Sequence, residues 1–237
     1  MLEKTIEFFS PLKGYIPDPK PASFFIPKEY KSLKAYNTDS LQYPTIKKCI
    51  PFLDAFMTGY ILPFSVDYEY TCDQNTNERS FIIPREIPSE FLKYFNINEH
   101  QNYQTPSELK SPHRTIDTTF KFSNPWVIKT PPGYSCIFVT PFNHSLPFEL
   151  VTGIVDTDQY EDYIKFPFFW TSDNTKNIIL QKGSPMVLVI PFKRESWKIK
   201  INDRLYDEKT EKKKKISFFG DLANNYKNKS WRKKSFK

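Results

Sequence analysis

The sequence predicts a mainly β protein on three observations. Aromatic residues make up 17% of the chain, and proline outnumbers glycine by 20 to 6. Aromatic side chains suit the half-buried surface of a sheet, and frequent proline breaks long helices. From residue 118 onward, short apolar segments alternate with turn-forming residues, and no helical pattern intervenes. We expect an antiparallel body resembling a jelly roll or barrel, with a few short helices and extended termini.

Composition divides the chain into three regions. Residues 1–45 are rich in proline, which opposes a helix, and in aromatic residues, which argue against a free linker. We expect this region to be an extended arm lying over the body or over a neighbouring subunit. Residues 46–200 form the predicted β-rich body, and residues 201–237 form a basic tail.

Two short helices are predicted in the first half of the body. In residues 45–60, Thr45 can cap a helix, apolar residues recur at spacings of three and four, and Gly59 ends the pattern. Residues 88–95 can form one or two further helical turns. Residues 97–115 are polar and are expected to form a surface loop.

Alternating apolar residues predict a hairpin with strands at 61–70 and 80–83, joined by a turn at 72–77. The remaining strands are expected at residues 118–122, 126–129, 134–140, 149–155, 163–170, 178–180 and 185–192. Apolar residues at helical spacing also predict one amphipathic helix in the tail, formed by Phe218, Phe219, Leu222 and Tyr226.

Positive charge is concentrated in the tail. The chain carries a net charge of +7, and residues 209–237 alone contain eleven basic and two acidic residues, a net +9. The rest of the chain therefore carries −2. This distribution gives no support to nucleic-acid binding by the body and directs the search for an anionic partner to the tail.

The three cysteines and three histidines are widely spaced, and no pair has a spacing typical of zinc ligands. We expect no metal and no cofactor, and we expect the cysteines to be buried small apolar residues in a reducing compartment. The first residues lack a secretory signal pattern, and no apolar run is long enough to span a bilayer. The expected location is the cytoplasm.

The most informative segment runs from Gly153 to Tyr160. Asp156, Asp158 and Tyr160 follow an apolar strand pattern there. An aspartate at a strand end can orient water as a general base, and a tyrosine can stack on a sugar or base. Two carboxylates could also ligate a cation, although calcium needs more oxygen ligands than this segment supplies. The alternative, which we favour, is a turn whose aspartates bond the local backbone.

A wider pattern surrounds this segment. Its parts are Pro132-Gly133-Tyr134 before a strand, Gly153-Ile154-Val155-Asp156 with Tyr160, and Ile179 with Gly183 to Ile190. In this order, the segment from Tyr134 to Glu195 resembles the core of the dUTPase and dCTP-deaminase fold. The resemblance implies a jelly-roll-like body, a trimer, a water-activating role for Asp156 and a deoxyribose-packing role for Tyr160.

The catalytic motifs of that family are incomplete in this chain. Asp156 and Tyr160 are one residue too far apart, and Leu188 stands where the family has glutamine. Residues 141–145 replace the family's Arg-Ser-Ser phosphate motif and contain no arginine. A triphosphate requires backbone amides or basic side chains. We therefore expect no enzymatic activity and keep a nucleotide-handling hydrolase or deaminase using Asp156 as the alternative.

A second resemblance covers most of the chain. The segments Thr45 to Asp54 and Thr58-Gly59-Tyr60, together with Tyr134 to Glu195, are similar to an uncharacterised family of bacterial and tailed-phage proteins. This resemblance implies a phage or bacterial origin and, for a phage protein, a location in the host cytoplasm or the virion. It implies no activity.

The tail supplies the second candidate site. Its basic and aromatic candidates are Lys212, Lys213, Lys214, Lys215, Trp231, Arg232, Lys233 and Lys234. Such residues can bind a phosphate backbone and stack on bases, and they would also suit an anionic membrane surface. The alternative is a solvated tail that docks on an acidic patch of a partner subunit.

These observations favour a non-enzymatic structural or interaction protein. We expect it to form homo-oligomers through its β body and terminal arms. Nucleic acid or an acidic protein is the expected further partner of the tail.

Overall fold

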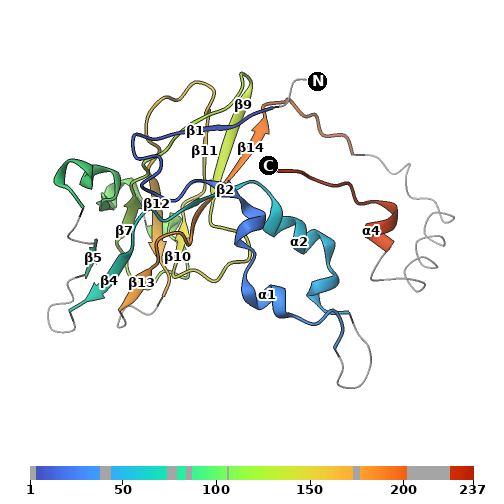
Figure 1. The fold of residues 1–237 in the computed structure, drawn as a ribbon, viewed down its shortest axis with the longest axis horizontal. Coiled ribbons are helices and arrows are strands. Elements are labelled where there is room, and N and C mark those ends of the chain that lie inside the picture. The colour runs from blue at the N-terminus through green and yellow to red at the C-terminus, as the bar shows by residue number, and fades with distance from the viewer. Residues whose placement is uncertain are drawn as a thin grey trace.

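The predicted mainly β architecture with short helices is confirmed. The computed structural model describes residues 4–37, 44–73, 79–83, 87–105, 107–172, 177–201 and 225–237. Figure 1 shows a body of strands beside three short helices, α1 (Lys28–Ser32), α2 (Ile50–Met57) and α4 (Asn225–Lys229). Over these residues the strands form several separate sheets and do not close into one barrel.

The largest sheet has five strands. In spatial order they are β11 (Gly153–Val155), β9 (Tyr134–Val139), β14 (Pro185–Lys193), β3 (Tyr60–Pro63) and β2 (Lys20–Pro21). The long strand β14 lies at the centre and pairs antiparallel with both β9 and β3. Its residues 186–189 are all buried, which explains why an uninterrupted apolar run forms a strand here.

Three smaller sheets complete the body. The four-stranded sheet consists of β10 (Phe148–Leu150), β12 (Phe166–Trp170), β7 (Thr119–Phe122) and β6 (Ile97–His100). The three-stranded sheet consists of β13 (Ile178–Leu180), β4 (Tyr68–Cys72) and β5 (Arg79–Ile82). The last pair joins β1 (Glu7–Phe9) to β8 (Val127–Lys129).

Aromatic side chains join these sheets into one core. The rings of Phe122 and Phe168 stack with their centroids 3.8 Å apart, and Tyr70 of the three-stranded sheet stacks on Trp170 at 4.3 Å. Phe64, which follows β3, contacts Phe122 edge-on at 5.3 Å. All five side chains are buried, so these aromatic residues serve to pack the sheets against one another.

The helix predicted over residues 45–60 is present. A 3-10 turn, η2 (Ile46–Lys48), leads into α2, and the Thr45 hydroxyl accepts a hydrogen bond from the backbone N–H of Lys47 at 3.3 Å. Gly59 follows the helix with φ +77°, and a Cβ there would overlap the carbonyl oxygen of Val189 in β14. Only glycine therefore allows the chain to pass so close to β14. The remaining 3-10 turns are η1 (Ala22–Phe25), η3 (Ser89–Tyr94), η4 (Asn102–Gln104) and η5 (Ser107–Leu109).

The proline-rich arm contains a helix that the sequence argued against. α1 begins directly after Pro27, a place where proline is tolerated because the first backbone N–H groups of a helix have no partner within it. In the same arm, β1 and β2 pair with β8 and β3. The strands of the arm thus lie on the body of their own chain.

The loop predicted over residues 97–115 is wrong in part, because residues 97–100 form β6 and pair with β7. β6 is an edge strand with mostly polar side chains, so its sequence lacks the apolar alternation that predicts a strand. The single strands predicted at 61–70 and 149–155 each divide into two strands that belong to different sheets. The pairing of the two hairpin strands is confirmed, since β4 pairs with β5, whereas most of the predicted turn at 72–77 lies outside the described residues.

Candidate functional site

The segment from Asp156 to Tyr160 forms a tight turn at the end of β11. The carbonyl oxygen of Asp156 accepts hydrogen bonds from the backbone N–H groups of Gln159 and Tyr160, both at 2.9 Å. The Tyr160 side chain is exposed. The backbone of this turn therefore satisfies its own hydrogen bonds, as short turns rich in aspartate do.

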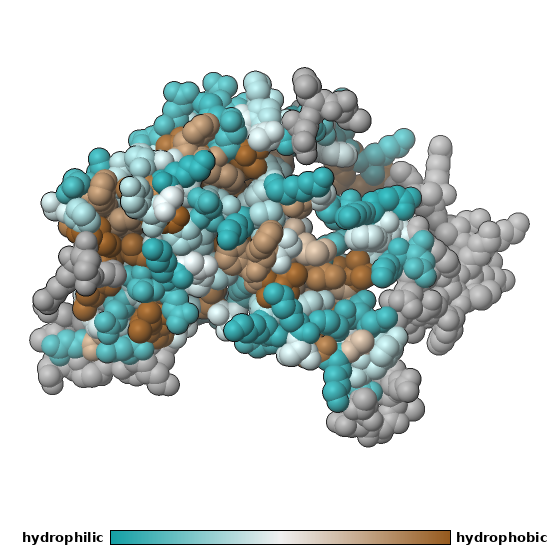
Figure 2. Space-filling view, viewed as in Figure 1, coloured by the Kyte–Doolittle hydropathy of each residue, from teal (hydrophilic) through white to brown (hydrophobic). Residues whose placement is uncertain are grey.

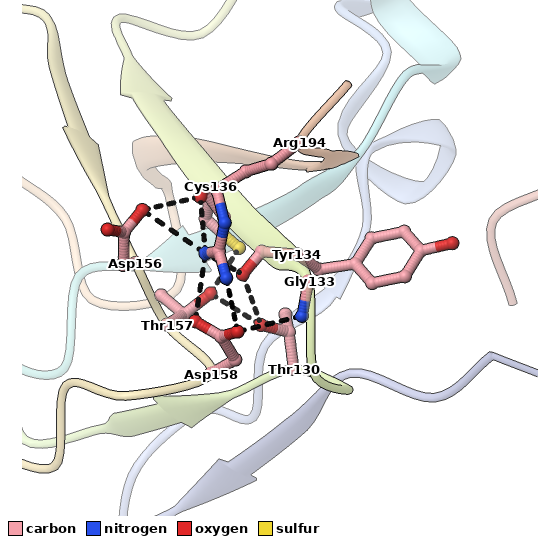
Figure 3. Close-up of polar contacts among 9 residues, drawn as sticks. Thr130, Gly133, Tyr134, Cys136, Asp156, Thr157, Asp158 and Arg194 are labelled. Carbon is pink, nitrogen blue, oxygen red and sulfur yellow. Dashed lines mark hydrogen bonds and ion pairs between the residues drawn. The ribbon is translucent and has the colours of Figure 1, made fainter. Parts of the chain in front are cut away.

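The Asp158 carboxylate points inward, and its side chain is only 2% exposed. It accepts a hydrogen bond from the backbone N–H of Gly133 at 2.8 Å. It also accepts hydrogen bonds from the two terminal guanidinium nitrogens of Arg194, from Nη1 to Oδ1 at 2.9 Å and from Nη2 to Oδ2. Arg194 directly follows β14, and Gly133 directly precedes β9. One carboxylate thus joins the turn after β11 to the ends of two neighbouring strands (Figure 3).

Asp156 lies on the outer side of the same arginine, and its side chain is 63% exposed. It accepts the Ser135 hydroxyl at 2.6 Å and lies 3.3 Å from Nη1 of Arg194. The same Nη1 also donates to the Ser135 hydroxyl at 3.0 Å and to the Tyr134 carbonyl oxygen at 3.1 Å. We call this group, centred on Arg194, Asp156, Asp158 and Ser135, the Arg194 clamp.

The inner wall of the clamp is buried and hydrogen-bonded. The hydroxyls of Thr130 and Thr157 lie 2.7 Å apart, and the Thr157 hydroxyl donates to Sγ of Cys136 at 3.3 Å. Burial raises the pKa of the Cys136 thiol to about 11. A thiol with this pKa stays protonated near neutral pH and is a poor nucleophile. Cys136 is fully buried as predicted, whereas Cys49 and Cys72 are half-buried.

The electrostatics of the clamp favour structure over catalysis. Hydrogen bonds from Arg194 and then from the Gly133 amide hold the pKa of Asp158 well below its usual range, and the Asp158 carboxylate raises the pKa of Arg194. A carboxylate with so low a pKa is a weak general base, since efficient bases have a pKa near the working pH. Two carboxylates around one guanidinium also leave a net negative charge, which repels a phosphate.

Metal ligation finds no support in the parts of the chain that the structure describes. Over these residues, no group of three or more His, Cys, Asp or Glu side chains could hold a metal ion. Asp156 and Asp158 are instead both bound to Arg194 (Figure 3).

The second candidate site lies in residues 225–237, which we call the strap. Nε1–H of Trp231 donates to Oδ2 of Asp54 in α2 at 2.9 Å, and the Lys234 ammonium binds the same oxygen. The Phe236 ring lies edge-on to Tyr60, with centroids 5.8 Å apart. The tail candidates Trp231 and Lys234 thus dock on the body of their own chain. Lys212, Lys213, Lys214 and Lys215 lie outside the described residues.

A cavity of about 510 Å³ opens between the strap and the start of α2. Tyr226 of α4 lines one side, and the other lining residues are Pro44, Thr45, Ile46, Lys48, Cys49, Ile50 and Pro51. The sequence analysis missed both this cavity and the role of Asp54. A carboxylate inside the otherwise apolar helix Ile50–Met57 was the one available indication that this face receives a basic partner.

Comparison with known proteins found no protein-family model and no curated protein that matches the chain. In the described part of the chain, no helix has the length and apolar character needed to cross a membrane.

Proposed function

We propose that the protein is a non-enzymatic structural or interaction protein that self-associates through its β body. The observation that supports this proposal most strongly is an exposed amphipathic segment after β14. Its apolar residues Trp197, Ile199 and Ile201 are 88%, 89% and 89% exposed and alternate with Lys198 and Lys200. Alternation of this kind places all three apolar side chains on one face of an extended strand.

The segment has no partner strand among the described residues, because it runs past the end of the strand beside it. The ladder between β14 and β9 ends at the pair Lys193 and Tyr134, and the backbone N–H of Arg194 then donates to the Gly133 carbonyl oxygen at 2.9 Å. The segment that precedes β9 in the same chain makes a turn at Pro132 and Gly133, closed by a hydrogen bond from the Tyr134 N–H to the Pro131 carbonyl oxygen. If this segment extends as a strand, its apolar face and unpaired backbone form a ready template for pairing with another chain.

The partner that fits best is strand β11 of a second copy. β11 is an edge strand of the five-stranded sheet, and its residue Ile154 is 61% exposed. The exposed acidic side chains Asp156 and Glu161 follow β11, and within the chain they pair with Arg194 and Lys129. These charges complement Lys198 and Lys200, whereas the opposite edge strand, β2, has only two residues and contains a proline.

We also propose a fold relationship and an origin for the protein. The segments that resemble the dUTPase and dCTP-deaminase core are β9 and β11, which pair with each other, and β14, which pairs with β9. This placement supports our proposal of a jelly-roll-like relative of that fold, and the trimer that we propose rests on the resemblance alone. We further propose a phage or bacterial origin, with the protein in the host cytoplasm or in the virion.

Light scattering coupled to size exclusion tests the proposal. We expect the full chain to elute at a multiple of 28.1 kDa, and we expect the triple variant Trp197→Ser, Ile199→Ser, Ile201→Ser to elute as a monomer with an unchanged circular dichroism spectrum. A matched control removes the exposed apolar residues Tyr15 and Leu109, which lie on other segments, and should keep the oligomer. A full chain that is monomeric at every concentration would contradict the proposal.

A further inference from the structure

The strap carries a concentrated positive charge that only Asp54 offsets in the described structure. Residues 225–237 contain six basic and no acidic residues. The Asp54 carboxylate pairs with Lys234. Arg232 and Lys233 are exposed, and no carboxylate of the described residues pairs with either of them. Among the residues that the structure describes, Arg232 and Lys233 therefore present a basic surface to solvent that no carboxylate offsets.

The anchors of the strap fix which side chains face outward. Trp231 and Phe236 are half-buried against Asp54 and Tyr60. Arg232 and Lys233 lie between these two anchors in the sequence and are exposed, and Nη1 of Arg232 donates to the carbonyl oxygen of Trp231 at 3.2 Å. Because the backbone on both sides is held, the two cations are positioned before a ligand arrives, which reduces the entropy lost on binding.

The cavity beside the strap has the size and walls of a site for a flat apolar group. Its volume of about 510 Å³ falls within the range of small-molecule pockets. The Tyr226 ring borders it, and prolines, isoleucines and Cys49 form much of the remaining wall. Lys48, which also lines the cavity, holds its ammonium 5.3 Å from the Tyr36 ring centroid. Figure 2 shows apolar surface over the α2 region, bordered by hydrophilic surface.

We propose that the strap and this cavity together bind single-stranded nucleic acid. Arg232 and Lys233 contact backbone phosphates, and one unstacked base enters the cavity against Tyr226. A cation strip beside an aromatic ring is the usual arrangement for single strands, since every base has a face that can stack. A duplex keeps its bases paired and cannot place one in the cavity.

The placement of the aromatic rings favours this partner over an anionic membrane. A membrane-binding tail would use Trp231 and Phe236 for insertion, but both rings pack against the body. These two residues are therefore anchors, and Tyr226 is the ring that meets the base. This inference does not depend on self-association, because all its residues belong to one chain.

Fluorescence anisotropy with a labelled single-stranded oligothymidylate tests the proposal. We expect Arg232→Gln, Lys233→Gln to weaken binding and to reduce the slope of log affinity against log salt by about 1.4, since each single-strand phosphate contact contributes about 0.7. Tyr226→Ala should weaken binding at least about fivefold. The control Lys13→Gln, Lys20→Gln removes the same charge from exposed positions in the arm and should leave binding unchanged. Equal losses in this control and in the strap variant would overturn the proposal.

The variant Asp54→Ala tests whether binding requires the strap to be docked on the body or only its positive charge. The substitution removes one negative charge and so raises the net charge by one, and simple charge attraction therefore predicts tighter binding. Because Asp54 holds Trp231 and Lys234, the proposal predicts weaker binding with an unchanged circular dichroism spectrum. Tighter binding by this variant would overturn the proposal. So would a duplex that binds as tightly as the single strand, or binding to phosphatidylserine vesicles without binding to the oligonucleotide.

Discussion

The Arg194 clamp and the strap both use a carboxylate to join distant segments, but they differ in what else holds those segments. Asp158 and Arg194 are 36 residues apart, and they follow β11 and β14, which both pair with β9 in one sheet. Asp54 and Lys234 are 180 residues apart, and the described hydrogen bonds from the strap to the body are made by Asp54 and Tyr60. The same chemistry reinforces a sheet edge in one region and attaches a whole segment in the other.

Burial sharpens this difference. The Asp158 side chain is 2% exposed and receives an arginine fork and a backbone amide, whereas the Asp54 side chain is 11% exposed and shares one oxygen between an indole and an ammonium. Removing Arg194 leaves the buried Asp158 carboxylate without its cationic partner, which is strongly destabilising. Loss of a strap contact leaves Asp54 closer to water, so its effect should stay local.

The largest expected effect is that of Arg194→Ala on global stability. We expect the thermal midpoint to fall by several degrees, because Asp158 loses its partner while it remains buried. Asp156→Asn should stay close to the original midpoint, since the Asp156 side chain is exposed. The thermal midpoint of Trp231→Ala should lie between those of these two variants. Circular dichroism melts measure all three, and a larger loss from Trp231→Ala than from Arg194→Ala would reverse the comparison.

Acid should reveal the same asymmetry. The folded protein holds the pKa of Asp158 below its usual range through Arg194 and the Gly133 amide. This contribution to stability is complete above the unfolded pKa of about 3.9 and is lost as pH falls through the lower folded pKa. Urea unfolding from about pH 6 down to about pH 3 should therefore show a fall in the free energy of unfolding below about pH 4. In Arg194→Ala this fall should be shallower, and an unchanged pH dependence would contradict the assignment.

The smallest and most local effects should appear in cysteine reactivity. Cys136 lies behind the clamp and Cys49 lines the cavity beside the strap, so each region contains its own reporter. We expect Arg194→Ala to speed alkylation of Cys136 and Trp231→Ala to speed that of Cys49, with Cys72 as the internal reference. Mass spectrometry of peptides after brief iodoacetamide treatment gives the three rates. Parallel acceleration of Cys49 and Cys136 in either variant would show that the regions are not independent.

The sequence predicted the parts of the fold that depend on local pattern. β9 and β14 are buried over long apolar runs, and the helix after Thr45 begins and ends with recognisable residues. The polar edge strand β6 was not predicted, because it forms a strand by pairing with β7 rather than through a pattern in its own residues.

The candidate sites were predictable only as residue types. Asp158 was expected in a turn, but its partner Arg194 is brought to it by the pairing of β9 with both β11 and β14, which no local spacing in the sequence encodes. Asp54 and Trp231 are 177 residues apart, so their contact depends on tertiary packing. Interactions of this kind join elements whose relative positions emerge from packing, so composition and periodicity do not contain them.

Gly59 sets a limit on how this protein can vary. Any side chain at this position would meet the main-chain oxygen of Val189, and its positive φ already disfavours other residues. Relief would require α2 to shift away from β14, and Asp54 would move with the helix. The strap could exchange many of its residues and keep its place, whereas a single methyl group at position 59 would displace the carboxylate on which the strap docks.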